Sequence, residues 1–281
     1  MKHIVLVAKN AFRGVMSQRA LYMWGFAVVI MFLRSAPALF SQNRAPDFMA
    51  FLRANAVSGS LDMWSYLCMA GAIYLGSTSM SSELHSKRII TVLARPIQRW
   101  QMMIGKWIGL SAFCVVTLGL GIALGFGLSR YLGVNVEGDV LAISATRTIA
   151  GIVLFAGVAT AVSTMGSAPI AAAVTMFLAI VPALIPPLKD DPSPTYQRIG
   201  KALDVIIAPG YASNYNGVVW APMPIPPQFR GRVPPQVRQL QQRPQVDFDA
   251  QRKQTAETVG YAGVYFLLGC IAFTRRDLKF S

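Results

Sequence analysis

Long apolar stretches separated by short polar segments dominate the pattern of this chain. Six stretches come close to the roughly 20 residues that an α-helix needs to cross the hydrocarbon core of a bilayer. They cover residues 21–40, 63–79, 107–128, 148–165, 169–188 and 258–274. The pattern therefore predicts an all-α polytopic membrane protein with six transmembrane helices.

Lysine and arginine side chains gather in three of the polar segments, and this bias predicts the orientation. The N-terminal segment holds Lys2, Lys9, Arg13 and Arg19 and no acidic residue. The segment after the second apolar stretch holds one acid, Glu83, and the basic residues Lys87, Arg88, Arg95, Arg99 and Lys106. The C-terminal segment is also mainly basic, with Arg275, Arg276 and Lys279. Six spans place these three segments on one side, so we expect both termini to be cytoplasmic.

The composition agrees with a multi-pass protein of the inner (plasma) membrane and excludes an ordinary soluble enzyme. Of 281 residues, 54% are hydrophobic and 14% are charged, whereas soluble domains carry about 25% charged residues. We assign the net charge of +14 to basic residues at the span ends and not to nucleic-acid binding. Cys68, Cys114 and Cys270 all lie in apolar stretches, where we expect small buried side chains and no structural disulfide.

The same pattern divides the chain into four parts. Residues 1–20 form a basic amphipathic segment that should lie at the cytoplasmic interface. Residues 21–188 hold five transmembrane helices, with a cytoplasmic segment at 81–106. Residues 189–257 form a long extracytoplasmic loop rich in Pro and Gln, much of which should be irregular because proline removes backbone hydrogen bonds. Residues 258–281 hold the sixth helix and a cytoplasmic tail.

Two details modify this division near the long loop. Pro182, Pro186 and Pro187 predict a broken outer end for the fifth helix, because proline interrupts the helical hydrogen bonds. Within the loop, apolar residues recur at helical spacing and predict a short helix on the outer membrane face. These residues are Tyr196, Ile199, Leu203, Ile206 and Ile207.

Motifs for catalysis are missing from the sequence. It contains no G-x-x-x-x-G-K-[ST] loop that could cradle a phosphate, no H-E-x-x-H and no G-x-S-x-G. His3 and His85 are the only histidines, which is too few for a usual metal site. We therefore expect neither an enzyme active site nor a cofactor in this chain.

The most informative polar segment runs from Glu83 to Lys106. Its apolar residues step by three or four and form one helical face, consisting of Ile89, Leu93, Ile97, Trp100 and Ile104. The basic residues lie off this face, and Pro96 should divide the helix into two short pieces. From the residues alone, the segment is either an interfacial element with a function or a lipid-facing loop that only sets the topology.

This segment resembles the first cytoplasmic loop of ATP-binding-cassette exporter permeases of the ABC-2 type. In that family an acid precedes a short helix, followed by a Leu-small-x-Pro-aliphatic-x-Arg turn and a Gly-Lys pair that opens the next span. The counterparts in this chain are Glu83, residues 93–99 (LARPIQR) and Gly105-Lys106. The basic N-terminal segment and the ending 273–278 (FTRRDL) are similar to the family as well.

The resemblance implies a permease subunit without its own ATPase. A separate ABC ATPase, which would carry ATP and Mg, would dock on the cytoplasmic face. A second permease copy or a paralogue would complete the transporter in the lipid bilayer. The segment would couple ATP-driven closure of the ATPases to the spans, through Glu83, Lys87, Arg88, Arg95, Pro96, Arg99 and Lys106.

Four residues within the spans or at a span end are further candidates. Arg34 lies near the outer end of the first span, where it either reaches the headgroups or faces a substrate path together with Asp62. Gly121 and Gly125 form a G-x-x-x-G pattern in the third span, which brings helix backbones close together. The pattern serves packing within one chain or a dimer seam.

Two other functions remain open at this stage. The chain could be a membrane anchor or scaffold that presents its proline-rich loop to partners without transporting anything. An integral membrane enzyme acting on lipid is the weakest reading, since no nucleophile–base or metal constellation is visible. An ATPase that co-purifies with the chain would favour the transporter.

The charge bias generates a prediction about topology. Cysteines introduced at Ser86 and at Gln241 should react with a membrane-impermeant maleimide from opposite sides of the membrane. Labelling of intact and opened vesicles measures this. Reaction of both positions from the same side would contradict the six-span arrangement.

Overall fold

The computed structural model describes residues 2–16, 18–40, 46–85, 98–190, 193–206, 215, 218–221 and 247–275. Within these residues the chain is helical and contains no strand. The helices are α1 (Lys2–Val15), α2 (Gln18–Phe40), α3 (Pro46–His85), α5 (Arg99–Leu132), α6 (Gly138–Ser163), α7 (Ala168–Asp190), α8 (Pro194–Ile206) and α10 (Phe248–Arg275).

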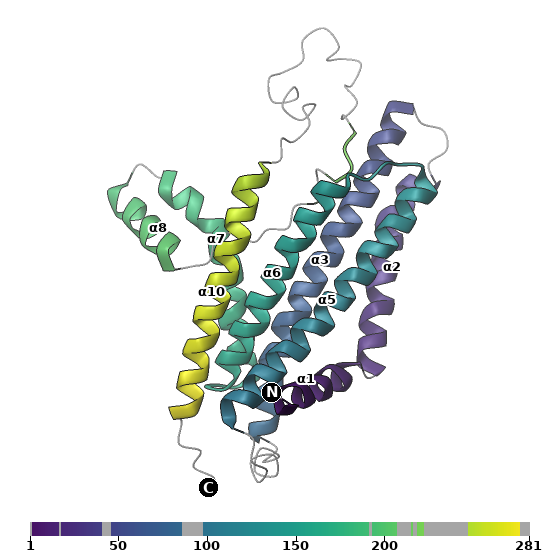
Figure 1. Ribbon diagram of the computed structural model, residues 1–281. Coiled ribbons are helices and arrows are strands. Elements are labelled where there is room, and N and C mark those ends of the chain that lie inside the picture. The colour runs from purple at the N-terminus through teal and green to yellow at the C-terminus, as the bar shows by residue number, and fades with distance from the viewer. Residues whose placement is uncertain are drawn as a thin grey trace.

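The long helices form one bundle, and α1 lies across one end of it (Figure 1). We call this the terminal end, because the N-terminus and the last turn of α10 both lie there; the opposite end is the loop end. Helix α3 packs against α2, α5, α6 and α7, and α6 packs against α3, α5, α7 and α10. Helix α5 also packs against four helices, α1, α3, α6 and α10, so α3, α5 and α6 form the centre of the bundle, while α8 packs beside α7.

Three of the described helices are long and apolar enough to cross a membrane: α5, α6 and α10. Helices α2 and α7 contribute shorter apolar stretches, Trp24–Phe40 and Ala168–Pro182. The outer faces of α2, α7 and α10 carry large exposed apolar side chains, including Phe26, Phe32, Phe177, Ile180, Leu267 and Leu268. Exposed faces of this kind are suited to lipid as the solvent.

Helix α3 is less apolar because protein buries most of it, although Tyr66 and Tyr74 remain exposed. Several of its buried side chains are serines, namely Ser58, Ser60, Ser65, Ser77 and Ser81. The Ser58 hydroxyl donates to the Ala54 carbonyl at 3.0 Å, and the Ser77 hydroxyl donates to the Tyr74 carbonyl at 2.9 Å. A buried hydroxyl that is satisfied within its own helix avoids the cost of an unpaired polar group. A central helix can therefore be polar where a lipid-facing helix cannot.

The helix boundaries differ from the expected spans. Helix α3 has 40 residues, or about 60 Å of length, so it extends well beyond the expected span at 63–79. Helix α5 begins at Arg99 and ends before Gly133, whose left-handed φ of 66° caps it. Helix α10 begins at Phe248, ahead of the expected start at 258.

The predicted break in the fifth helix is wrong. Helix α7 continues to Asp190 through Pro182, Pro186 and Pro187. The ring of a proline costs one hydrogen bond and a steric clash, yet the helix geometry is retained in this stretch. Beyond it, α8 forms where the apolar spacing around Tyr196 predicted a short helix.

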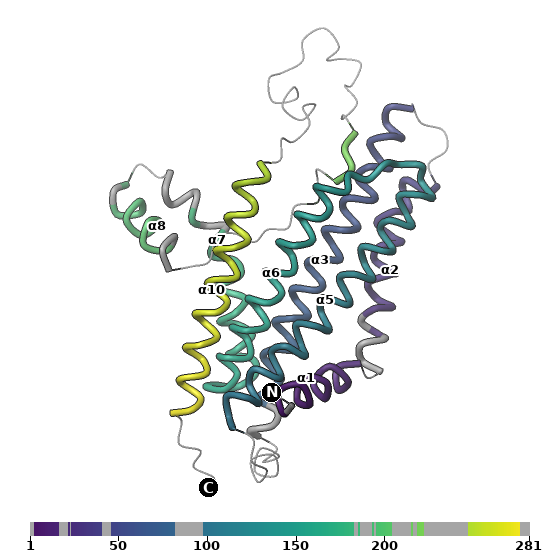
Figure 2. The backbone as a smooth tube through the Cα atoms, viewed as in Figure 1, coloured from purple at the N-terminus to yellow at the C-terminus, as the bar shows by residue number. Residues whose placement is uncertain are grey.

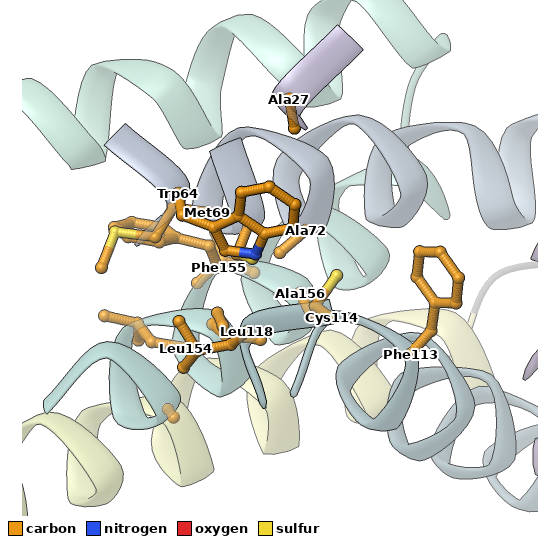
Figure 3. Packing of buried hydrophobic residues seen from close by; sticks show 14 residues of the cluster. Ala27, Trp64, Met69, Ala72, Phe113, Cys114, Leu118, Leu154, Phe155 and Ala156 are labelled. Carbon is orange, nitrogen blue, oxygen red and sulfur yellow. The ribbon is translucent and has the colours of Figure 1, made fainter. Parts of the chain in front are cut away.

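Two tryptophans join helices in the core, and Figure 3 shows one of them, Trp64, among the buried side chains of the main cluster. The Trp64 indole N–H donates to the Thr117 carbonyl at 2.7 Å, and this bond joins α3 to α5. The Trp107 indole N–H donates to the Val153 carbonyl at 2.9 Å and joins α5 to α6. Each indole fills a large volume and satisfies its polar edge across a helix interface.

Glycines provide the space for these contacts. A Cβ atom at Gly121 would lie 1.9 Å from Cδ1 of Trp64, and one at Gly125 would lie 2.6 Å from Cδ2 of Leu61. The two glycines of the predicted G-x-x-x-G pattern therefore face α3 within the same chain. A Cβ atom at Gly76 would similarly lie 2.7 Å from the Cβ of Ala159. Small residues at such crossings let the helices approach closely.

A pair of substitutions in α5 tests this packing. Gly121→Ala should destabilise the protein by about 1–3 kcal/mol, because the indole that it meets is fixed by its hydrogen bond to Thr117. Gly119→Ala is the matched control, since no atom lies within 4 Å of its added Cβ. The control should be neutral or stabilising by up to about 1 kcal/mol. Thermal unfolding in detergent measures both, and equal melting temperatures would contradict the packing argument.

Candidate functional site

The segment with the most informative sequence connects α3 to α5 at the terminal end. Its central residues 86–97, which include Lys87, Arg88, Arg95 and Pro96, lie outside the described residues. Glu83 belongs to the last turn of α3, and the structure does not describe its side chain. Arg99 is the first residue of α5 and is half-buried. The segment is therefore bracketed by two of the longest helices in the protein.

Helix α5 begins sharply at the end of this segment. The backbone N–H of Gln98 donates to Oε1 of Gln101 at 3.4 Å, and the Trp100 indole donates to Oε1 of Gln98. The first bond occupies a backbone N–H that the start of a helix otherwise leaves open, and the second joins two side chains of the first turn. Trp100 and Ile104 were expected in a separate interfacial helix, but they belong to the first turns of α5.

Lys106 ties the two flanking helices together. Its side chain is only 7% exposed, and its Nζ donates to the Ser79 carbonyl of α3 at 2.5 Å. The lysine was expected to anchor the start of the third span, with lipid headgroups as the alternative partner. The structure instead places it inside the protein, where a buried ammonium group depends on the acceptors around it.

Helix α1 rests on α5 beside Lys106. A Cβ atom at Gly109 would lie 2.4 Å from the carbonyl oxygen of Ala8, and one at Gly105 would lie 2.7 Å from the Cβ of Val7. The aromatic ring of Phe12 packs edge-on against Phe113, with 6.0 Å between the ring centroids. The expected interfacial segment is thus also a packed helix, because one face of it contacts α5.

The sequence contained a signal for this contact that the sequence analysis did not use. Gly105 and Gly109 form the same G-x-x-x-G spacing as Gly121 and Gly125 and lie about four turns earlier on α5. The pattern predicts a close helix contact but not its partner. Only the three-dimensional structure shows that this partner is α1.

A second polar cluster lies at the loop end. The carboxylate Oδ1 of Asp62 accepts the backbone N–H of Tyr215 at 2.9 Å. The Tyr215 hydroxyl is 3.1 Å from Oγ1 of Thr148. The backbone N–H of Glu137 donates to the Val218 carbonyl at 2.9 Å. A piece of the long loop, described at residues 215 and 218–221 and called the strap below, is therefore bonded to α3, to α6 and to the turn before α6.

The strap is buried between the helices. Tyr215, Val218 and Val219 have 0%, 0% and 4% of their surfaces exposed. They share a cluster with side chains of α2, α3, α5 and α6, namely Ala38, Ala54, Ala56, Val57, Leu61, Leu132 and Val140. Burial raises the pKa of the Tyr215 phenol to about 12, so it stays protonated at physiological pH. The strap covers the loop end of the bundle.

Sequence reasoning missed the strap, because it expected order in 189–257 only in the short helix around Tyr196 and took much of the rest as irregular. The available signal was local: Tyr215, Val218, Val219 and Trp220 form an apolar group inside a proline-rich region. Such a group lacks the periodicity of a helix or a strand. Its burial depends on tertiary contacts alone.

Arg34 and Asp62 lie in the same region, near enough for the charge of the guanidinium to act on the carboxyl group, but they are not in direct contact as an ion pair. The Arg34 side chain is exposed and lies over Gly59, where a Cβ atom would be 2.4 Å from its Nε. No ion pair joins Arg34 to Asp62 among the described side chains; the Asp62 carboxylate holds the strap instead. A substrate path through these two residues stays a prediction.

The described residues contain no group of three or more His, Cys, Asp or Glu side chains that could hold a metal ion. All three cysteines are buried and free of disulfides.

The bond between Asp62 and the strap leads to a prediction. Asp62→Ala should loosen the strap, because it leaves the Tyr215 N–H without its acceptor at a cost of about 1–3 kcal/mol. Asp62→Asn keeps an acceptor oxygen and should largely preserve the contact. Hydrogen exchange of peptides covering 215–221 measures the effect. We expect exchange to be roughly tenfold faster in the alanine variant. Unchanged exchange in that variant would contradict the role of Asp62.

One family relationship accounts for the sequence motif and the helical architecture. Residues 6–278, nearly the whole chain, match the family model described as ABC-2 family transporter protein. No curated protein matches the chain. The family consists of membrane components of ABC transporters that associate with an ABC ATPase. The chain therefore belongs to the ABC-2 transporter family, as a multi-pass membrane permease component.

Proposed function

We propose that this chain is the membrane-spanning permease subunit of an ATP-driven exporter. In this proposal six helices span the inner (plasma) membrane, both termini face the cytoplasm, and two permeases pair, either as copies or as paralogues. A separate ABC ATPase carries ATP and Mg2+ and docks at the terminal end against segment 81–106. This chain holds no ATPase site of its own.

The observation that carries the proposal is the bond between Lys106 and Ser79. These residues belong to the two helices that flank the docking segment. Because α3 and α5 are bonded to each other close to the segment that connects them, a force on this segment would act on both helices together. Glycine contacts with α1 at Gly105 and Gly109 add a third helix to the same unit.

The arrangement of the helices supports the six-span topology. Along the chain, α2, α3, α5, α6, α7 and α10 alternate in direction between the two ends of the bundle (Figure 2). The terminal end carries α1, with exposed Lys9 and Arg13, and Arg275 at the end of α10. Basic residues at this end agree with the cytoplasmic side.

Transport in this proposal is a switch between two packings of the bundle. Closure of the ATPases shifts the equilibrium only if their contacts with segment 81–106 differ between the two states. Joined helices favour a rigid-body movement over a local bend. Glu83, in the last turn of α3, and Arg99, at the start of α5, are the polar groups we expect to orient the docking contact.

Co-purification tests the proposal directly. The tagged full-length chain, extracted from its own membranes in mild detergent, should carry with it an ATPase that contains a P-loop and hydrolyses ATP. A scaffold that only presents its proline-rich loop would bring down no such ATPase. Its absence under conditions that preserve the permease would overturn the proposal.

Coupling is tested in the reconstituted complex. The double variant Glu83→Ala/Arg99→Ala should lower the ATPase stimulation by the permease at least about fivefold, in the range of ordinary coupling energies. Arg130→Ala is the matched control, because Arg130 is an exposed arginine at the loop end of the same helix. Normal stimulation in the double variant would remove both residues from the coupling contact.

A further inference from the structure

A groove lies between α6 and α10 near the loop end. Its volume is about 410 Å3, which is within the range of small-molecule sites in proteins. The groove is lined by Ile143, Thr146, Arg252, Thr255, Ala256 and Val259. It is separate from the strap and from the docking segment, and none of these residues has a part in the proposed transport mechanism.

The lining follows from helical spacing. Arg252, Thr255, Ala256 and Val259 are separated by three, one and three residues, which places them on one face of α10. On α6, Ile143 and Thr146 are also three residues apart and line the opposite wall. A hydrogen bond of 3.2 Å from Nη2 of Arg147 to Oε1 of Gln254 aligns the two helices next to the groove.

The groove changes from polar to apolar along its length. Helix α10 starts at the loop end and runs towards the terminal end, so Arg252 lies nearer the membrane surface and Val259 lies deeper. Seven residues of helix separate the two by about 10 Å. An arginine at the surface with aliphatic side chains below it matches the order of headgroup and acyl chain in a phospholipid.

The hydrogen bonds in the groove determine what it can recognise. The Thr146 hydroxyl donates to the Ile143 carbonyl at 2.8 Å, and the Thr255 hydroxyl donates to the Gln251 carbonyl at 2.8 Å. Their protons are used, so their oxygen atoms are left to accept hydrogen bonds. The Arg252 side chain is exposed and supplies N–H donors in a planar fork that suits a phosphate.

Other charges near Arg252 do not neutralise it directly. Lys253 follows it on the helix, and both Asp249 and Glu257 are exposed on α10. Among the described side chains, no ion pair joins Arg252 to either acid. The guanidinium is therefore accessible to an anionic group at the mouth of the groove.

We propose that this groove is a binding site for a glycerophospholipid of the leaflet at the loop end. The phosphate binds the Arg252 guanidinium, and hydroxyl or amino groups of the headgroup donate to the threonine oxygens. One acyl chain lies along Ala256 and Val259. The lipid fills the seam between α6 and α10, two of the helices that span the membrane.

Native mass spectrometry of the full-length protein tests the site. The probes are phosphatidylglycerol and a diacylglycerol with the same acyl chains, which lacks the phosphate. Arg252→Gln should reduce the retention of phosphatidylglycerol about fivefold, as expected for the loss of one basic contact at a membrane surface. Lys253→Gln removes the same charge at the neighbouring exposed position, outside the lining, and should leave retention unchanged.

A second pair of variants tests the apolar part of the groove. Ala256→Phe should fill it and lower phosphatidylglycerol retention while Arg252 is intact. Val264→Phe enlarges an exposed apolar side chain further along α10 and serves as its control. Recovery of each variant from membranes and its association with the ATPase are recorded separately. A folding defect or a failure of the transport proposal is therefore distinguishable from loss of the lipid.

Three outcomes would overturn the proposal. Equal retention of diacylglycerol and phosphatidylglycerol by the unmodified protein would show that the phosphate is not recognised. Equal losses in Arg252→Gln and Lys253→Gln would show a general surface charge effect. Full retention in Ala256→Phe would show that the chain does not occupy the groove. Selective loss in Arg252→Gln and Ala256→Phe supports the site.

Discussion

Close approach of helix backbones through small residues is the constraint on which the rest of this structure depends. Helices in a bilayer gain little hydrophobic energy from contact with each other, because the lipid is as apolar as their side chains. Packing and hydrogen bonds must hold them instead. The glycines at positions 76, 105, 109, 121, 125 and 269 each lie where an added Cβ would meet a neighbouring helix at under 3.0 Å. By contrast, an added Cβ at Gly119 or Gly127, which also belong to α5, would meet no atom within 4 Å.

These contacts make the two ends of the bundle physically different. At the terminal end, α1 packs closely on Gly105 and Gly109 of α5, and the buried Lys106 joins α5 to α3. This end can therefore move as one unit. At the loop end, the cover is a short strap whose bonds to the helices include those from Asp62 and Thr148. The strap is also buried in an apolar cluster of α2, α3, α5 and α6, so apolar contacts and hydrogen bonds together hold it. The two ends are therefore held by different means: close helix contacts at glycine at the terminal end, and a buried segment of the long loop at the loop end.

Much of the fold could be predicted from the sequence, because lipid imposes a strong pattern on the helices that face it. Helices α5, α6 and α10 follow from their apolar composition. The existence of helix α3 could be predicted, but its ends could not. Its buried serines make the sequence look polar, although their hydroxyls are hydrogen-bonded within the helix. Lys106 was recognised from its motif, but its partner Ser79 is 27 residues away in sequence. The strap could not be predicted, because an aperiodic group around Tyr215 gains its structure only from the helices that enclose it.

The length of α3 gives the proposed coupling a direct physical route. Asp62, which holds the strap, and Ser79, which accepts from Lys106, lie on the same uninterrupted helix. Seventeen residues separate them, or about 26 Å along the axis, close to the thickness of the hydrocarbon core. This stretch contains no proline, and α3 is one continuous helix (Figure 1). In the proposed exporter, a shift of α3 at the terminal end therefore reaches the Asp62 contact without passing through a flexible element.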